Sequence, residues 1–267
     1  MLFQRIILAS LLVGLLAGGL LSAVQHSQVT SIILEAETYE GGEEPEPVVV
    51  EDHPHAAADA HHSHEHEHGG AEAGGHHHGD DAWAPEDGVE RTLYTLLANV
   101  LAGIGFSALM LACMYAARLS GKGGAGWGAG LLWGLAGYGV FFVAPALGLP
   151  PEIPGMQAAA LENRQLWWIA TALVTAIGFA LLAFAPGWKK LGGLPLMIIP
   201  HLVGAPHTNA PEFAASNPQA LQALESLHHQ FITAATLTNA LFWVIVGLAC
   251  AWFLRRWSSQ DAALQAR

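Results

Sequence analysis

The chain has 267 residues, of which 52% are hydrophobic and only 12% are charged. A soluble domain usually carries about 25% charged residues, so the composition argues against a soluble protein and favours a membrane protein. The formal net charge is −12, and 17 of the 22 acidic residues lie between residues 35 and 90, an acidic tract that repels nucleic acids and attracts cations.

Five segments are long and apolar enough to cross a membrane as helices, which takes about 20 residues each. They are residues 6–25, 93–117, 127–149, 166–185 and 231–254. A sixth segment, 191–203, is apolar but short, and Pro195 and Pro200 interrupt it. Alone, this segment is typical of a re-entrant piece or a broken helix.

The basic residues indicate whether the sixth segment crosses. Six of them follow predicted spans: Arg118, Lys122, Lys189, Lys190, Arg255 and Arg256. With the N-terminus in the cytoplasm, the last two are cytoplasmic, as the positive-inside rule requires, only if segment 191–203 crosses. We therefore predict an all-α polytopic membrane protein with about six transmembrane crossings and both termini cytoplasmic. Arg91 and Arg164 are the exceptions, since this topology places them outside.

The predicted organisation has three parts. Residues 1–34 form the first transmembrane helix, residues 35–90 an acidic His-rich extracytoplasmic loop, and residues 91–267 a membrane domain with helices 2 to 6. The loop is rich in Gly and Pro and is expected to be disordered without a ligand. The alternative for the first helix is a cleaved signal peptide, although its apolar core exceeds the usual length of about 7–15 residues. N-terminal sequencing of the mature protein distinguishes the two.

Histidines are the principal candidate metal ligands. Ten of the 15 lie in the outer loop: His53, His55, His61, His62, His64, His66, His68, His76, His77 and His78. Neutral imidazoles bind zinc, copper, iron and nickel, and mixed nitrogen and oxygen sites also accept cobalt. The loop is therefore predicted to collect metal as an antenna, separate from the transport site. The alternative is a low-complexity tract that only buffers metal.

The other five histidines fall at the outer ends of predicted crossings: His26, His201, His207, His228 and His229. In the six-crossing topology no histidine is cytoplasmic, so histidines and most basic residues occupy opposite faces. Glu35 and Glu37 follow the first helix and can form a mixed site with His26. The alternatives are histidines anchored among lipid headgroups and a merely solvated acidic helix end.

The predicted spans carry no Asp, Glu, Lys or Arg at their centres, so they offer no intramembrane charge of the kind that marks ion pathways. Thr171 and Thr175 are expected to hydrogen-bond to a neighbouring helix or to their own. Cys113 and Cys250 are interpreted as buried hydrophobic residues. Neither a Walker A sequence nor a catalytic Ser-His or Cys-His arrangement is present, so we do not predict an enzyme.

Small residues at intervals of four predict close helix packing. They are Gly14, Gly18 and Ser22 in the first span and Gly126, Gly130 and Gly134 in the third. The first series can pack within this chain or against a partner helix, and the spacing does not distinguish the two.

Several stretches together resemble the CbtA-type cobalt transporter subunit family. They are RIILASLLVGLLAGGLLSAVQ (5–25) followed by ILEAETYE, GYGVFFVAPALGLPPEIPG (137–155), RQLWW (164–168) and PHLVGAP (200–206). The resemblance implies cobalt uptake linked to cobalamin synthesis in the bacterial inner membrane, with a small CbtB-like partner that has one membrane helix. It also makes Glu152 a candidate metal ligand or a structural anchor. The His-rich loop is longer than this family leads us to expect.

The sequence thus predicts the membrane subunit of a divalent transition-metal uptake system. No tightly bound cofactor is expected, and Co²⁺ is the expected cargo, with Ni²⁺ or Zn²⁺ as alternatives. The identity of the metal follows from the resemblance alone, because affinity order favours copper over cobalt at most nitrogen and oxygen sites. The alternative functions are a metal-binding membrane sensor or chaperone that serves a separate permease, and a nickel or zinc permease.

Overall fold

The computed structural model describes residues 2–39 and 85–265, and these fold almost entirely as helices. The α-helices are α1 (Leu2–Gln28), α2 (Thr30–Glu37), α3 (Val89–Leu119), α4 (Trp127–Tyr138), α5 (Ala144–Ala146), α6 (Leu161–Phe184), α7 (Gly193–Val203) and α8 (Pro218–Gln265). A π-helical turn, η1 (Gly139–Val143), joins α4 to α5, and a 3₁₀-helix, η2 (Gly187–Gly192), precedes α7. The described residues form no strand, so the predicted all-α fold is confirmed.

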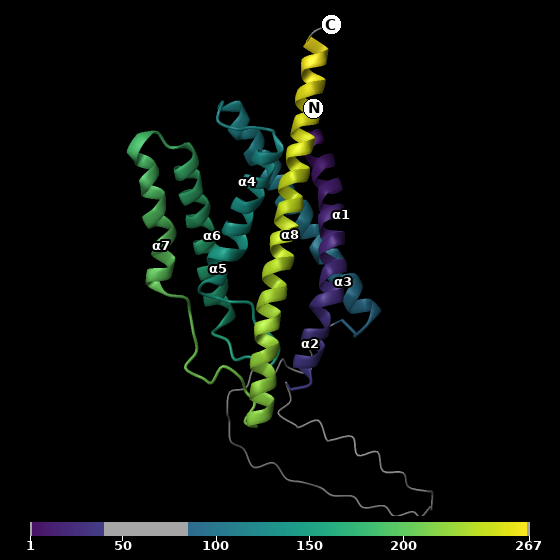
Figure 1. Ribbon diagram of the computed structural model, residues 1–267, viewed down its shortest axis with the longest axis vertical. Coiled ribbons are helices and arrows are strands. Elements are labelled where there is room, and N and C mark those ends of the chain that lie inside the picture. The colour runs from purple at the N-terminus through teal and green to yellow at the C-terminus, as the bar shows by residue number, and fades with distance from the viewer. Residues whose placement is uncertain (1, 40–84, 266–267) are drawn as a thin grey trace, which may run out of the picture.

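Five helical segments are long and apolar enough to cross a membrane: Leu2–Gln28, Val89–Leu119, Trp127–Ala146, Leu161–Phe184 and Pro218–Ser259. The short α7 runs beside α6, back toward the end of the bundle where α8 begins, and both termini lie at the opposite end (Figure 1). In addition to its five long helices, the chain therefore runs along the bundle once more, through α7. Five apolar helices of this length are typical of a multi-pass membrane protein, and the shorter α7 lies beside them.

The short helix α7 is helical throughout, despite its prolines. Pro195 lies in the first turn, where a missing N–H breaks no intrahelical bond, and Pro200 lies inside the helix. The helix ends at Val203 because Gly204 adopts a φ of 87° and returns its N–H to the Pro200 carbonyl at 3.0 Å. With 11 residues, α7 is about 16 Å long, roughly half the thickness of the hydrocarbon core.

The last helix is longer than predicted. Instead of starting near residue 231, it begins at Pro218, where the Asn217 side chain accepts a hydrogen bond of 2.9 Å from the Gln219 N–H. Asn before Pro is a strong helix start, because the amide caps a free N–H and the proline ring suits the first turn. The expectation that His228 and His229 begin this helix was therefore wrong, since about three turns precede them.

Glycines bring helices into direct backbone contact. A Cβ built on Gly18 would lie 2.6 Å from the Asn99 carbonyl oxygen of α3, so the α1 series packs within this chain. On α4, Gly130 and Gly134 meet Gly247 of α8, whose Cβ would lie 2.3 Å from the Gly130 oxygen. The predicted close packing is thus confirmed, except at Gly126, which has nothing within 4 Å.

The main core lies where α1, α3, α4 and α8 meet, around buried Met110, Leu111, Trp243 and Val246. Cys250 is fully buried there, and its Sγ lies 3.8 Å from the Ser107 oxygen. Cys113 is instead exposed on the surface of the bundle, so the prediction that both cysteines are buried was wrong for Cys113.

A second, smaller core closes the end of the bundle opposite the termini. It is formed by Ile32, Ala36, Ile153, Phe213, Leu224 and Leu227. Two connecting segments, 147–160 and 204–217, pair across it through an isolated bridge between Met156 and Phe213. The Gln157 N–H donates to the Glu212 oxygen at 2.9 Å, and the Ala214 N–H donates to the Gly155 oxygen at 3.2 Å. We call this paired arrangement the loop clasp.

Candidate functional site

The predicted ligands that the structure describes all belong to the end of the bundle with the loop clasp. His26 lies on α1, Glu35 and Glu37 on α2, His201 near the end of α7, and His228 and His229 on α8. Glu152 and His207 lie in the two connecting segments. The ten histidines from His53 to His78 lie outside the described residues, between the end of α2 and the start of α3.

These ligands share one end of the bundle but do not converge. Within residues 2–39 and 85–265, no group of three or more His, Cys, Asp or Glu side chains is close enough to hold one metal ion. His26 and Glu35 are exposed, each on its own helix. The structure therefore brings the predicted ligands to one face without assembling a closed metal centre from the described residues.

Two of the candidate carboxylates are paired with arginines. The Arg91 guanidinium forms a two-pronged contact with Glu37, at 2.5 and 3.1 Å, and also donates to Asp87 at 2.9 Å. Glu152 is paired with Arg164 through a single guanidinium nitrogen and a single carboxylate oxygen. Arg91 and Arg164 are the two basic residues that the predicted topology placed outside, and each is neutralised by a neighbouring acid.

His228 holds both segments of the loop clasp. Its Nε2 donates to the Pro151 carbonyl oxygen at 3.1 Å, and its Nδ1 lies 3.3 Å from Glu212 Oε1. A carbonyl oxygen only accepts hydrogen bonds, so Nε2 carries the proton, and Nδ1 forms an ion pair with the Glu212 carboxylate when the ring is protonated. Glu212 was not predicted as a ligand, because only the folded chain brings it to His228.

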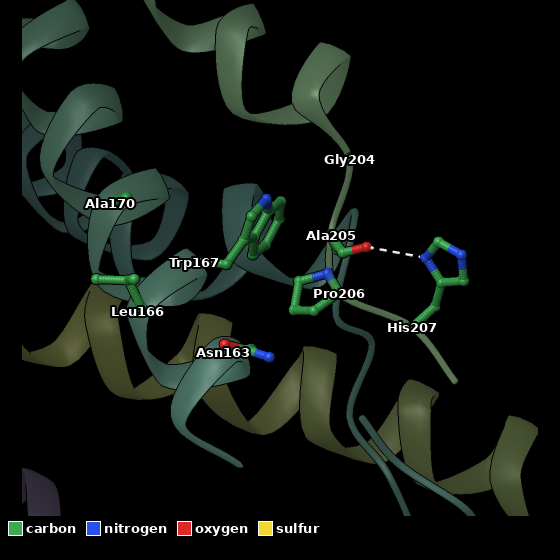
Figure 2. A pocket seen from close by; sticks show the side chains of 8 residues that line it. All are labelled: Asn163, Leu166, Trp167, Ala170, Gly204, Ala205, Pro206 and His207. Carbon is green, nitrogen blue, oxygen red and sulfur yellow. Dashed lines mark hydrogen bonds between the residues drawn. The ribbon is translucent and has the colours of Figure 1, made fainter. Parts of the chain in front are cut away.

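A pocket of about 500 Å³ opens between the outer part of α6 and the segment that follows α7. It is lined by Asn163, Leu166, Trp167, Ala170, Gly204, Ala205, Pro206 and His207 (Figure 2). The His207 ring turns away from Trp167 and places Nδ1 3.2 Å from the Ala205 oxygen. The pocket joins two of the stretches on which the family resemblance rests, RQLWW and PHLVGAP.

Trp167 forms the inner wall of this pocket. Its Nε1 donates to the Pro200 carbonyl at 3.3 Å, and its ring lies edge-on to the His201 ring with 5.9 Å between centroids. His201 therefore lies near the pocket but does not line it, in contrast to His207. Asn163 also lines the pocket; no metal-ligand pattern distinguished it in the sequence.

The polar groups inside the helices differ in their hydrogen bonding. Thr233 and Asn239 on α8 bond back to their own helix, to the backbone oxygens of His229 and Ala235. Thr171 and Thr175 on α6 do neither of the expected things: both are fully buried, and neither hydroxyl has a hydrogen-bond partner among the described residues. An unsatisfied buried hydroxyl costs about 1–3 kcal/mol.

Comparison with protein families decides the identity of the chain. The family model described as "Probable cobalt transporter subunit (CbtA)" matches residues 3–255, nearly the whole chain. The chain belongs to the CbtA family. The match includes α7 and nearly all of the five long spans of this CbtA-family protein, so the predicted resemblance is confirmed. The family description makes the chain a subunit, which implies partner subunits and a metal ion as cargo. No curated protein and no solved structure matches the chain.

Proposed function

We propose that this CbtA-family protein is the membrane subunit of an uptake system that carries cobalt inward, in support of cobalamin synthesis. The observation that carries the proposal is the separation of charge between the two ends of the bundle. One end gathers basic side chains, and the other gathers histidines and acids. A cation attracted to the acidic end and moved to the basic end moves inward if the basic end faces the cytoplasm.

The basic end is formed by residues that contact neighbouring helices. Arg118 donates to the Leu254 oxygen at 3.2 Å, and Lys122 donates to the Phe184 oxygen at 2.6 Å. Arg255 lies over the Trp127 ring, 5.5 Å from its centroid. By the positive-inside rule we assign this end, with both termini, to the cytoplasmic side of a bacterial inner membrane.

At the outer end, the His-rich loop between α2 and α3 collects metal in this proposal. His26, Glu35, Glu37, Glu152, His201 and His207 are the proposed ligands that guide the ion toward the pocket. Glu37 and Glu152 exchange their arginine partners for the metal if they serve this way. A small single-helix CbtB-like subunit completes the system, as the family resemblance implies.

Metal flux in liposomes tests the proposal. Liposomes that contain only this chain and its small partner should take up Co²⁺ at a rate above that of empty liposomes. Competition by Ni²⁺ and Zn²⁺ identifies the preferred cargo. Binding of Co²⁺ without flux would overturn the transporter and support a metal-binding sensor or chaperone.

Deleting residues 50–80 should raise the Co²⁺ concentration needed for half-maximal uptake but leave the maximal rate unchanged. The reason is that an antenna raises the local concentration of the ion without forming the path across the membrane. Uptake should be measured against Co²⁺ concentration at equal amounts of protein in the membrane. A deletion variant that transports nothing would contradict the antenna.

Replacing His201 by Ala should lower the maximal rate of Co²⁺ uptake severalfold. The imidazole lies beside Trp167 at the inner wall of the pocket, where its loss removes a nitrogen ligand from the proposed route. His229→Ala is the matched control, because His229 is exposed on α8 and does not line the pocket. Unchanged uptake by the His201 variant would reduce this residue to an anchor.

A further inference from the structure

Thr171 and Thr175 stand apart from the other hydroxyl groups of the bundle. Elsewhere, buried hydroxyls return their hydrogen to their own helix: Thr238 donates to the Ala234 oxygen at 2.6 Å, and Ser107 donates to the Ile104 oxygen at 3.1 Å. Thr171 and Thr175 are equally buried, but neither Oγ1 meets a partner in the described part of the chain. Two such groups one turn apart indicate a place that accommodates something polar.

The contacts of α6 show where these hydroxyls lie. One face of α6 meets α7, through Trp167 against Pro200 and Gly178 against Gly193. Another face meets η1, where Phe179 packs against Gly139 and Trp168 faces Phe141. At about 100° per residue, Thr171 and Thr175 point roughly 40° and 80° around the helix from Trp167, between these two faces. The hydroxyls therefore lie along the seam where α6, α7 and η1 meet.

The helix turn on the other side of this seam also lacks one backbone hydrogen-bond donor. In η1 the backbone follows a π-helix, with the Ala144 N–H bonded to the Gly139 oxygen. Pro145 follows with no N–H to offer, so one carbonyl of η1 loses the helical hydrogen bond that another residue would supply. Single π-helical turns of this kind are frequent at functional sites.

The seam lies between the pocket at one end and a tight helix contact at the other. Toward the outer side, one turn from Thr171, Trp167 forms the wall of the pocket (Figure 2). Toward the basic end, α6 and α7 touch directly, since a Cβ on Gly193 would lie 2.4 Å from the Gly178 oxygen. The two hydroxyls thus lie between the Trp167 wall of the pocket and a tight helix contact.

We propose that Thr171 and Thr175 form a transit site for a partly hydrated divalent cation, reached from the pocket and closed on the inner side by the Gly178–Gly193 contact. The inference rests on the proposed uptake function. A hydroxyl oxygen can bind a metal ion directly, through its lone pairs, or through one of the water molecules bound to the ion. Water-mediated contacts are nearly as favourable as direct ones. Neutral oxygens hold the ion loosely enough to release it, which conduction requires.

The test is the double variant Thr171→Val/Thr175→Val, which removes both hydroxyls and keeps the shape of the side chains. Co²⁺ uptake into liposomes with the full chain and its small partner should fall roughly tenfold or more, because each polar contact to an ion is worth about a factor of ten. The melting temperature in detergent should stay the same or rise, since two unsatisfied buried groups are removed. A purely structural role predicts no loss of uptake.

Two further variants separate the outcomes. Thr238→Val, which removes a buried hydroxyl that has a partner, should transport like the wild type. Thr171→Ser/Thr175→Ser keeps the oxygens and should restore most of the uptake, even if the valine variant folds poorly. The transit site alone is overturned if a folded valine variant takes up Co²⁺ as fast as the wild type. It is also overturned if the serine variant takes up Co²⁺ no faster than the valine variant. No uptake by the wild type overturns the proposed function as well.

Discussion

Replacing Gly18 by Leu should prevent α1 from packing on α3, whereas the same change at the neighbouring Gly19 should leave the bundle intact. A Cβ on Gly18 would lie 2.6 Å from both the Asn99 oxygen and the Val100 Cα, which are backbone atoms that cannot rotate away. A Cβ on Gly19 would have nothing within 4 Å. Overpacking usually lowers the free energy of unfolding by about 1–3 kcal/mol. A clash with backbone atoms at this distance should cost about 3 kcal/mol or more.

Folding of the two variants should be compared by the monodisperse fraction in size-exclusion chromatography and by thermal unfolding in detergent. Gly19→Leu is the matched control, because it adds the same side chain to the same helix on its lipid-facing side. It should unfold close to the wild type or slightly above it, since Leu favours the helix more than Gly does. Equal stability of both variants would show that α1 does not pack on α3 through Gly18.

Replacing Glu152 by Ala should destabilise the protein by about 1–3 kcal/mol, between the values for exposed and buried ion pairs. Glu152 and Arg164 are only 27% and 26% exposed, and the Arg164 Nε is buried without a hydrogen-bond partner in the described residues. Without Glu152, the guanidinium near the membrane surface loses its charge partner. The midpoint of unfolding should therefore fall measurably.

Removing both partners should cost less than removing the acid alone, because no uncompensated charge remains. Glu152→Ala/Arg164→Ala is thus expected to unfold above Glu152→Ala, while Glu162→Ala, at an exposed acid nearby, should match the wild type. The same variants decide between the anchor and the ligand. A Glu152→Ala protein with normal stability but weaker Co²⁺ binding would make this residue a ligand.

The long helices were predictable because a run of about 20 apolar residues is the length that crosses the hydrocarbon core as a helix. Each predicted span falls within or near an observed helix. The ends of the helices were less predictable. The first three turns of α8, from Pro218 onward, are too polar for a span, and their start depends on the Asn217 cap. The η1 turn had no sequence signal beyond the proline that follows it, because a π-helix depends on packing against α6.

The sequence indicated that the candidate ligands share one end of the bundle, but not what each of them contacts. Histidine and acid counts indicated one face, and that face is where the described candidates lie. The pairing of Glu37 with Arg91, 54 positions apart, depends on how α2 meets α3. Arg91 and Arg164 had already appeared as exceptions to the charge rule, and that exception was the available signal for both ion pairs. The unpartnered state of Thr171 depends on side-chain rotamers, which the sequence alone does not determine.

The shortness of α7 has a consequence for the lipid around it. A bilayer responds to a hydrophobic stretch shorter than its own thickness by thinning locally, which draws headgroups and water toward the protein. Beside α7 this thinning would occur at the segment from Gly204 to His207, whose backbone is not helical. If α7 crosses the bilayer, the low-dielectric layer that a doubly charged ion has to cross is narrower on this flank of the protein than on the flank formed by the 27 residues of α1.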